Sequence, residues 1–370
     1  MRTTKDNFQP VWALGLMSGT SLDGIDVAAI RTDGVEVCER GAWLTVPFEE
    51  SFRKQMYEAV RGKGDMAHIE NLITIKHADA IRSFLKESGM NSKDISVIGF
   101  HGQTIAHRPQ DGITVQIGNG SLLAERTGID VVCDFRRRDV AAGGQGAPLV
   151  PIYHAALAKK LDLPVAVLNI GGIANITWIG RSEHSDEDIL AHDIIAFDTG
   201  PGNVMLNEWA LMHTGLPFDQ DGKMALAGKP DDTIVKRYMS DPFFILHPPK
   251  SLDRNYFSLN PLEHLSPEDG AATLTEFAAQ SIAAAAQYFP VPAKQWLITG
   301  GGRHNPALLN ALNQKLQNVK SVEAVGWEGD AMEAQAFAYL AVRSIRRLAI
   351  TVPTTTGVNK PVTGGGFYPV

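Results

Sequence analysis

The sequence has only two cysteines among its 370 residues, Cys38 and Cys133. Two thiols cannot form a disulfide framework, and neither lies at a metal-ligand spacing from another Cys or His. We expect both to be buried, small apolar residues in a reducing compartment. The chain also lacks an apolar signal core at its N-terminus and any run long enough to span a bilayer. We therefore expect a cytoplasmic protein that does not contact a membrane.

An excess of positive charge is missing too, because 34 Lys and Arg residues stand against 41 Asp and Glu residues. A large nucleic-acid footprint needs basic residues in excess, so the composition argues against nucleic acid as a partner. A Walker A loop is absent, since neither Gly222-Lys223-Met224 nor Gly228-Lys229-Pro230 completes its pattern. The glycines at 143–146 and 300–302 do not complete a Rossmann fingerprint either. Both common nucleotide-binding motifs are therefore disfavoured.

Two stretches, residues 11–30 and 164–179, share one pattern: an apolar run, a tight turn of small polar residues and a second apolar run. This pattern predicts a β-hairpin in each half of the chain. Glycines in such turns leave backbone N–H groups open to phosphate oxygens. For either turn alone, an ordinary turn is the alternative. Together they indicate a nucleotide held between two related domains.

The rest of the chain alternates between strand and helix patterns, which predicts an α/β fold. We expect two domains, residues 1–155 and 156–370, because the chain is too long for one compact core. Apolar residues at helical spacing predict helices within 48–90. The glycines and charges of 134–148 predict a long irregular loop, and residues 231–269, rich in Pro, Asp and Ser, are expected to form a surface insertion.

Five motifs carry a more specific signal. In chain order they are Leu14 to Gly24, His101-Gly-Gln-Thr104, Asp134 to Pro151, Leu168 to Gly172 and Phe197 to Asn203. With the glycine turn at 300–302 they resemble the anhydro-N-acetylmuramic acid kinases, a family of the actin-like ATPase and sugar-kinase superfamily. The resemblance covers nearly the whole chain. It implies a two-lobed actin-like ATPase (ribonuclease H-like) fold with a duplicated β-hairpin phosphate-binding core and a central cleft for ATP and sugar.

That family uses ATP to phosphorylate O6 of 1,6-anhydro-N-acetylmuramic acid while water opens the anhydro bridge at C1. The resemblance implies the same reaction here, giving N-acetylmuramic acid 6-phosphate and ADP in peptidoglycan recycling. ATP as co-substrate and Mg²⁺ are the implied cofactors. The expected partners are ATP and a small amino sugar, with a homodimer left open. A conventional sugar kinase without ring hydrolysis and an actin-like assembly protein are the alternatives.

The resemblance assigns the catalytic role to Asp198, as the general base that takes a proton from water. The residue follows an apolar strand and precedes glycines that permit close approach of a ligand. Its alternative role is the N-cap of the helix after Asn203, although Asn203 itself offers that cap. Asp23 is expected to orient the hydration shell of Mg²⁺, with an Asx-turn residue as an equal alternative.

The resemblance also assigns binding residues for each substrate. For the nucleotide they are Ser18, Gly19, Thr20, Ser21, Leu22, Asp23, Gly24, Ile25, Gly171, Gly172, Asn175, Gly300, Gly301 and Gly302. For the sugar they are His101, Gln103, Arg136, Arg137, Arg138 and Glu333. A guanidinium suits the lactyl carboxylate of the sugar. Ion pairs with Asp134 and Asp139 are the alternative for two of the arginines, and a solvated helix face is the alternative for Glu333.

Overall fold

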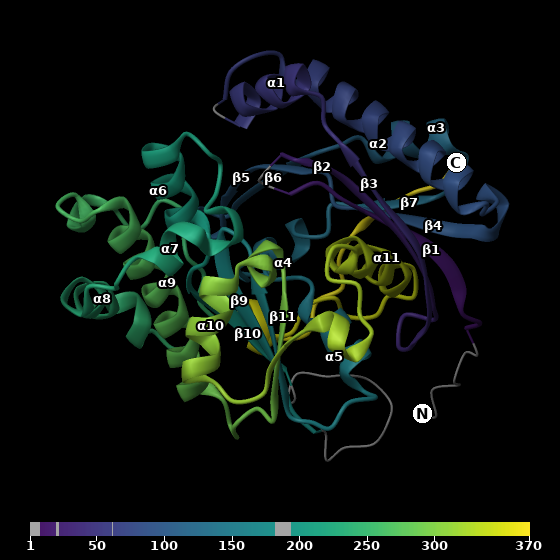
Figure 1. The fold of residues 1–370 in the computed structure, drawn as a ribbon. Helices are drawn as coiled ribbons and strands as arrows, with labels where there is room; N and C mark the ends of the chain where they lie inside the picture. The colour runs from purple at the N-terminus through teal and green to yellow at the C-terminus, as the bar shows by residue number, and fades with distance from the viewer. Residues whose placement is uncertain (1–7, 20–21, 61, 182–193) are drawn as a thin grey trace. The chain divides into compact units, whose positions relative to one another are not determined.

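The computed structural model describes residues 8–19, 22–60, 62–181 and 194–370. These residues form two compact units (Figure 1). The first contains the described residues up to Leu157 together with Ala331–Val370, and the second contains those from Ala158 to Asp330. The structure thus differs from the expected division, in which residues 156–370 formed one domain, because the C-terminal segment belongs to the first unit.

The first unit is built on a six-stranded sheet. Its strands are β1 (Val11–Met17), β2 (Gly24–Thr32), β3 (Val37–Pro47), β4 (Ile95–Phe100), β7 (Val131–Cys133) and β13 (Gly366–Tyr368), in the order β13-β7-β4-β1-β2-β3. Strands β1, β4 and β7 are parallel, whereas β2 is antiparallel to both of its neighbours. The first predicted hairpin is therefore formed by β1 and β2.

The second unit repeats this arrangement. Its strands are β8 (Val165–Ile170), β9 (Ile173–Ile179), β10 (Ile194–Pro201), β11 (Gln295–Thr299) and β12 (Val319–Ser321), in the order β10-β9-β8-β11-β12. Strands β8, β11 and β12 are parallel, and β9 is antiparallel to both neighbours. Without β13, the first sheet has the same order and the same directions. This duplication confirms both hairpins, the predicted α/β class and the predicted duplicated hairpin core.

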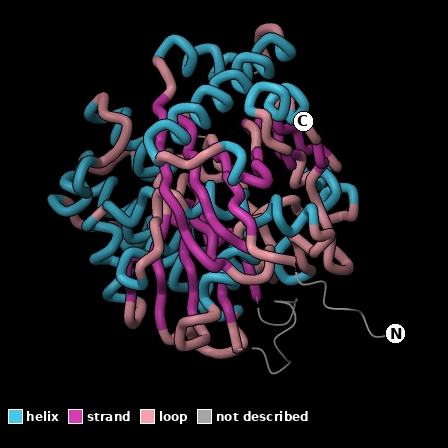
Figure 2. Tube along the Cα trace, turned by 90° about the vertical axis from the view of Figure 1, so that its right-hand side faces the viewer, coloured by secondary structure: helices cyan, strands magenta, loops and turns pink. Residues whose placement is uncertain are grey.

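Helices pack on both faces of the first sheet (Figures 1 and 2). The helices of this unit are α1 (Glu50–Val60), α2 (Met66–Ser88), α3 (Gly120–Thr127), α4 (Arg137–Ala141), α11 (Met332–Ile345) and α12 (Pro353–Thr356), and α5 (Pro151–Ala158) leads to the second unit. A separate two-stranded sheet pairs β5 (Gln103–Arg108) with β6 (Ile113–Ile117). Helices α1 and α2 confirm the helical pattern of 48–90. Over 134–148, where an irregular loop was expected, Arg137–Ala141 form the short helix α4 and the remaining residues are irregular.

Helix α11 lies directly on β1 and β4 because both strands have glycine at the contact. A Cβ placed on Gly15 would overlap the carbonyl oxygen of Ala334, and one on Gly99 would overlap that of Phe337. No layer of side chains therefore separates the helix backbone from these strands. This contact explains why the C-terminal segment joins the first unit.

The helices of the second unit are α6 (Val204–Thr214), α7 (Lys223–Ala227), α8 (Asp232–Met239), α9 (Pro267–Ala284) and α10 (Pro306–Lys315). The segment 231–269 is not a surface insertion, since Tyr238, Phe243 and Phe244 join a buried cluster with Phe277 of α9. The prolines and aspartates of this segment occupy helix starts and turns, whereas Tyr238, Phe243 and Phe244 are buried. The expectation was wrong because the Pro, Asp and Ser content of the segment does not reveal that these aromatic residues are buried.

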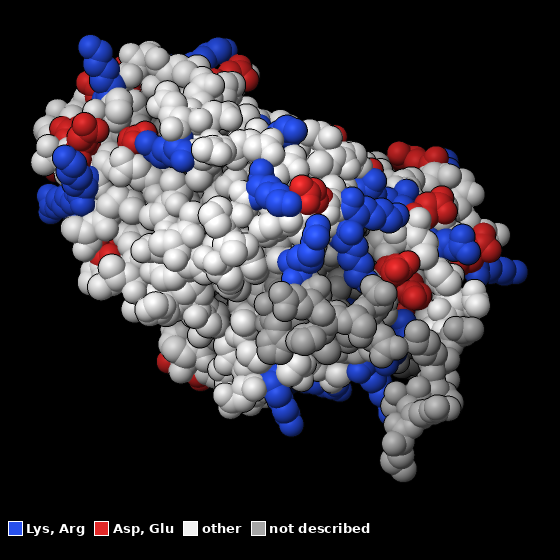
Figure 3. Space-filling view, turned by 90° about the horizontal axis from the view of Figure 1, so that it is seen from below, with Lys and Arg blue, Asp and Glu red and all other residues white. Residues whose placement is uncertain are grey.

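The exposure of the two cysteines agrees only in part with the prediction from the sequence. Cys133 is buried as expected, but Cys38 is exposed on β3, so that expectation was wrong for Cys38. On the face that Figure 3 shows, Lys and Arg side chains lie among Asp and Glu side chains. Over the described residues, every helix is too short or too polar to cross a bilayer.

We expect Gly15→Ala to lower the free energy of unfolding by roughly 1–3 kcal/mol, because the added methyl group forces the backbone of α11 away from β1. Urea denaturation followed by circular dichroism measures the change. Gly301→Ala is the control, since a Cβ there meets nothing within 4 Å, and its effect should stay within about 0.5 kcal/mol. Equal losses in the two variants would contradict the close contact.

Candidate functional site

The turn of the second hairpin lies against the segment that follows β10. The backbone N–H of Gly202 donates to the carbonyl of Gly172 at 2.8 Å, and that of Asn203 donates to the carbonyl of Gly171 at 2.8 Å. A Cβ on Gly202 would overlap the Gly171 oxygen. The glycine at 202 is therefore required by this backbone contact, which fixes the turn beside the start of α6.

The glycine turn at 300–302 follows β11 and packs against the end of β8, beside the second hairpin turn. Gly300 has a φ of +75°, and a Cβ there would overlap the side-chain oxygen of Asn169. Gly302 packs on Ile170, the last residue of β8. The side-chain amide of Asn203 donates to the Ile170 carbonyl at 3.1 Å. The carboxyl ends of parallel strands are where ligands gather in α/β folds, and the structure brings the predicted glycines together there.

Asp198 belongs to β10, at an irregularity of the strand pairing between Asp198 and Gly200. Its carboxylate oxygen Oδ2 accepts a hydrogen bond of 2.8 Å from the backbone N–H of Leu252. Burial raises the pKa of Asp198 to about 7, and the bond from Leu252 opposes that shift. A carboxylate with a pKa near neutral pH is partly ionised there, and its ionised form can accept a proton. Asp198 therefore has the chemistry of a general base.

The alternative role of Asp198 as a helix cap is wrong. Asn203 occupies the N-cap position of α6, yet its side chain makes no capping bond and binds Ile170 instead. Asn175 is the cross-strand neighbour of Asp198 on β9, and on its other side it pairs with Asn169 of β8. The predicted residue Asn175 thus lies between the carboxylate and the strand that leads to the hairpin turn.

The turn of the first hairpin contacts the segment that follows β4. The Ser18 hydroxyl lies 3.5 Å from the carbonyl oxygen of Gly102, and the Gln103 amide donates to the carbonyl of Gly19 at 3.3 Å. The side-chain oxygen of Gln103, Oε1, is buried and has no hydrogen-bond partner among the described residues. Thr20 and Ser21 lie outside the residues that the structure describes.

Three predicted residues of this turn have another packing role. The side chains of Leu22 and Ile25 are in the core, so only their backbone is available to a nucleotide. A Cβ on Gly24 would lie 2.5 Å from the carbonyl oxygen of Val46. The pairing of β2 with β3 therefore requires glycine at 24, whatever the ligand.

Asp23 has the exposed carboxylate of this turn, with 73% of its side chain accessible. Its Oδ1 lies 3.6 Å from the Arg53 guanidinium, while its backbone carbonyl accepts from Phe48. No group of three or more potential metal ligands occurs among the described residues. A lone exposed carboxylate still suits Mg²⁺, which binds through few carboxylates and keeps water and phosphate as its other ligands.

Arg136 interacts with two predicted sugar-site residues of the first unit, His101 by contact and Glu333 through its charge. Its Nη1 donates to the Gly146 carbonyl at 2.7 Å, and its Nη2 lies 2.9 Å from His101 Nε2. Burial lowers the pKa of Arg136 to about 10, opposed by the negative charges of Glu333 and Asp139. The guanidinium therefore stays charged at neutral pH. The negative charge of Glu333 favours the charged form of the buried Arg136 guanidinium. Glu333 is therefore not simply part of a solvated helix face.

His101 is the neutral partner of this arginine. Burial, helped by the Arg136 charge, lowers the pKa of His101 well below its usual range. Its Nδ1 lies 2.8 Å from the carbonyl oxygen of Gly102, and only a protonated Nδ1 can bond to a carbonyl. Nε2 is then the unprotonated nitrogen, which accepts from Arg136.

The neighbouring arginines are placed differently. Arg137 is 70% exposed, with its guanidinium 3.5 Å from Asp134. Arg138 donates to Thr363 from the surface. Asp139 is buried and accepts from Gly146 and Thr356. The alternative of an ion pair within the loop thus holds for Arg137, and Arg136 is the arginine that the structure joins to His101.

The family of the chain can be read from the comparison with known proteins. The family model described as anhydro-N-acetylmuramic acid kinase matches residues 11–370. The chain belongs to the anhydro-N-acetylmuramic acid kinase family. Its relatives include the enzyme of that name from Paramagnetospirillum magneticum, 52% identical over 96% of this chain and 99% of the relative. Another, from Rhodospirillum rubrum, is 48% identical over 97% of this chain and 94% of the relative.

Among solved structures, component A of the (R)-2-hydroxyglutaryl-CoA dehydratase of Acidaminococcus fermentans is similar at a TM-score of 0.47. That comparison covers 91% of this chain and 99% of the other, with 12% identity. So remote a likeness has no bearing on function.

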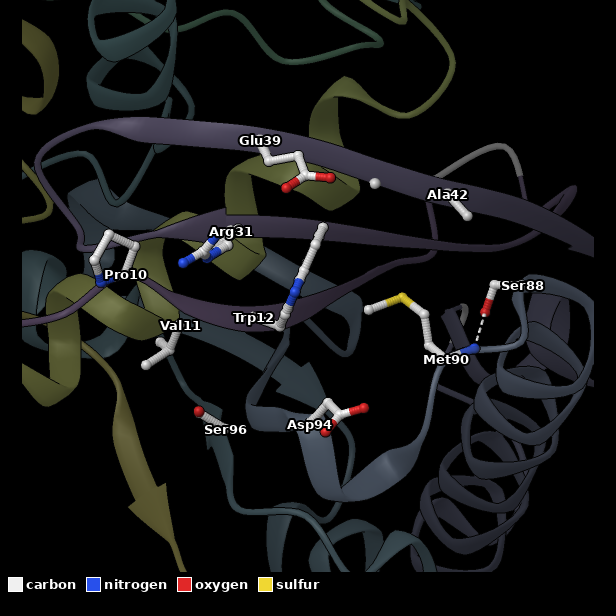
Figure 4. Close-up of a pocket in the computed structure, with 11 residues that line it drawn as sticks. Pro10, Val11, Trp12, Arg31, Glu39, Ala42, Ser88, Met90, Asp94 and Ser96 are labelled. Atoms are coloured by element: carbon white, nitrogen blue, oxygen red, sulfur yellow. Dashed lines mark hydrogen bonds between the residues drawn. The ribbon is translucent and has the colours of Figure 1, made fainter.

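A groove of about 710 Å³ lies at the opposite end of β1 from the hairpin turn (Figure 4). Trp12, Arg31, Glu39 and Asp94 are among its lining residues. The predicted site residues that the structure describes are not among them. The groove is therefore separate from the candidate site.

Two residues that contact Asp198, Lys250 and Leu252, were not expected from the sequence. Both contacts involve backbone atoms of the 231–269 segment, since the N–H of Asp198 also donates to the Lys250 carbonyl at 3.0 Å. The available signal was the aromatic content of that segment, which indicates a packed structure rather than a loose loop.

We expect the turnover number to fall about ten-fold per pH unit below about 7, because protonation of Asp198 removes the base. A pH profile of ADP release at saturating substrates measures this. The variant Asp198→Asn should keep ATP binding and lose roughly 10²–10⁴-fold in turnover, with a residual rate that no longer depends on pH in this range. Near-normal turnover in Asp198→Asn would show that the residue is not the base.

Proposed function

We propose that this member of the anhydro-N-acetylmuramic acid kinase family opens 1,6-anhydro-N-acetylmuramic acid with water and phosphorylates its O6 with ATP. The products are N-acetylmuramic acid 6-phosphate and ADP, and the role is peptidoglycan recycling. The observation that carries the proposal is the buried Asp198 carboxylate, with a pKa of about 7, on the strand that leads to Gly202 and the second hairpin turn. A cytoplasmic location is part of the proposal, because the reaction consumes ATP.

In the proposed reaction, Asp198 takes a proton from a water molecule as its oxygen attacks C1 of the sugar. The bond between C1 and O6 breaks, and its electron pair passes to O6. O6 then attacks the γ-phosphorus of ATP, and the bond from that phosphorus to the bridging oxygen breaks to give ADP. One carboxylate therefore serves both halves, since the oxygen freed by hydrolysis is the phosphate acceptor.

The phosphate contacts follow from backbone geometry. In the second unit, Gly171 and Gly172 form a turn whose residues lack side chains, so phosphate oxygens can approach the backbone closely. Gly301 has open space around it, as a turn facing adenosine needs. In the first unit, Ser18 and Gly19 would supply the corresponding donors.

Asp23 fits a magnesium ion that is bound mainly by water and by ATP. Mg²⁺ would neutralise the charge of the β- and γ-phosphates. The carboxylate of Asp23 would hold its hydration shell and release Arg53 in doing so. The distance of 3.6 Å between Asp23 and Arg53 is longer than a hydrogen bond, so this exchange gives up little.

Arg136 is the residue we assign to the lactyl carboxylate of the sugar. Two protein contacts, Gly146 and His101, hold its guanidinium plane, and planar carboxylates bind such a group through paired hydrogen bonds. Glu333, whose charge acts on Arg136, would accept from the sugar beside it. A neutral His101 leaves the net positive charge on the arginine.

The decisive experiment follows sugar-dependent ADP release across a small panel of anhydro sugars, with mass analysis of the product. Hydrolysis adds one water to the product and creates a reducing end, and in ¹⁸O-water the label should enter at C1. A sample of finished product incubated in ¹⁸O-water corrects for exchange. A phosphorylated product that keeps its anhydro bridge would identify a conventional sugar kinase, and ATP-dependent light scattering without turnover would identify an assembly protein.

We expect Arg136→Lys to raise the KM for the sugar at least ten-fold, because an ammonium cannot make the paired hydrogen bonds of a guanidinium. The KM for ATP should change little. Arg126→Lys, on the exposed face of α3, is the matched control. If Arg137→Lys or Arg138→Lys raised the sugar KM as much as Arg136→Lys, the choice among the three arginines would be wrong.

A further inference from the structure

A short segment, Lys250 to Leu252, runs beside Asp198 and binds it twice. The carbonyl of Lys250 accepts from the Asp198 N–H at 3.0 Å, and the Leu252 N–H donates to the Asp198 carboxylate at 2.8 Å. Strand β10 is an edge strand of its sheet, so this segment, which we call the strap, occupies the free edge. The strap thus orients both the backbone and the side chain of Asp198.

The side chain of Lys250 is buried in an aromatic cage. The residue is 8% exposed, and its ammonium donates to the Phe243 carbonyl at 2.9 Å. The ammonium lies 4.5 Å from the ring centre of Phe243, 4.9 Å from that of Tyr288 and 5.8 Å from that of Phe197. Among the described residues, no carboxylate lies within ion-pair distance of it.

A buried cation without a counter-ion is costly unless other groups replace its hydration. Here one carbonyl and the faces of three rings replace it, and cation–π contacts of this kind are worth more when water is excluded. Burial lowers the pKa of Lys250 to about 8, so the ammonium remains charged at neutral pH. Packing alone does not require a charge at this position, because an uncharged methionine would fill the same space without the free-energy cost of burying an ammonium.

The cage connects three parts of the second unit. Phe197 immediately precedes Asp198 in β10, Phe243 belongs to the 231–269 segment, and Tyr288 ends the 3₁₀ turn after α9. The Tyr288 hydroxyl also donates to the Phe244 carbonyl at 2.8 Å. The ammonium therefore ties the strap to the strand that carries the carboxylate.

We propose that Lys250 is a positioning residue for the general base: its caged ammonium fixes the strap, and the strap holds the Asp198 carboxylate through the Leu252 N–H. This inference rests on the proposed function, because it needs Asp198 to be the base. Without the ammonium, the strap loosens and the carboxylate gains freedom to rotate away from the water it must deprotonate.

The proposal has a signature in the pH profile. The Leu252 N–H stabilises the charged carboxylate, so its loss moves the acid limb of turnover to higher pH. The titratable groups near the cage include Tyr288 and His247, whose rings lie 5.8 Å apart, and Lys250 itself. Beside Phe243 they also include Asp241, which accepts from the Phe243 N–H at 2.8 Å, and Tyr256, whose ring lies 6.4 Å from that of Phe243. Burial raises the pKa of Tyr288 above its ordinary value, so the tyrosine stays neutral below pH 8.

The test compares Lys250→Met, which keeps the length but removes the charge, with Lys250→Arg, which keeps a cation for the cage. We expect Lys250→Met to lower turnover roughly ten-fold or more, with its acid limb moved upward by about half a pH unit or more and the KM for ATP unchanged. Lys250→Arg should recover a substantial part of both effects. Lys236→Met, at an exposed position of α8, should match the unmodified protein.

The outcomes separate cleanly. A folded Lys250→Met variant that loses turnover equally at every pH, or keeps it, overturns the positioning role. If that variant does not fold, Tyr288→Leu removes one ring of the cage, leaves the lysine in place and should shift the acid limb in the same direction; an unshifted limb there overturns the role too. Full activity of Asp198→Asn would instead refute the proposed function, whatever Lys250 does.

Discussion

The backbone contact between the second hairpin turn and the segment after β10 is the constraint on which the candidate site depends. Two N–H groups, those of Gly202 and Asn203, bind the carbonyls of Gly172 and Gly171. These bonds set the distance between the turn at Gly171 and Gly172 and the strand that carries Asp198. The glycine turn after β11 packs on Ile170, so it is held to the same point. The residues of the two turns themselves are glycines without side chains, which leaves their backbone open to a ligand.

The two units divide the electrostatic work. In the second unit, burial makes a carboxylate basic enough to take a proton near neutral pH. In the first, burial keeps His101 neutral while Arg136 retains its charge. Burial thus favours the neutral form of a side chain in both units. In the second unit it raises the proton affinity of Asp198, and in the first it removes a positive charge from His101 beside Arg136.

Much of the fold and of the candidate site was predictable, because hairpins, strand-end motifs and glycine turns are local features of the sequence. Asp198 and the glycines at 171, 172 and 300–302 could be chosen in that way. The strap was not predictable, since Lys250 and Leu252 bind Asp198 through backbone atoms that every residue possesses. The three adjacent arginines point in different directions because Arg137 begins a helix, and successive residues of a helix face different sides. The place of α11 was missed because the order of elements does not reveal which sheet a terminal helix covers.

The contact of α11 with bare strand backbone has a mechanical consequence. Layers of side chains can rearrange, but a helix seated on Gly15 and Gly99 has no such compliant layer beneath it. Strand β1 ends at the first hairpin turn, and α11 begins one residue before Glu333. Any shift of β1 along its axis would therefore carry Glu333 with it as part of one stiff body. Within the first unit, a displacement at the first hairpin turn and a displacement at Glu333 would be a single motion.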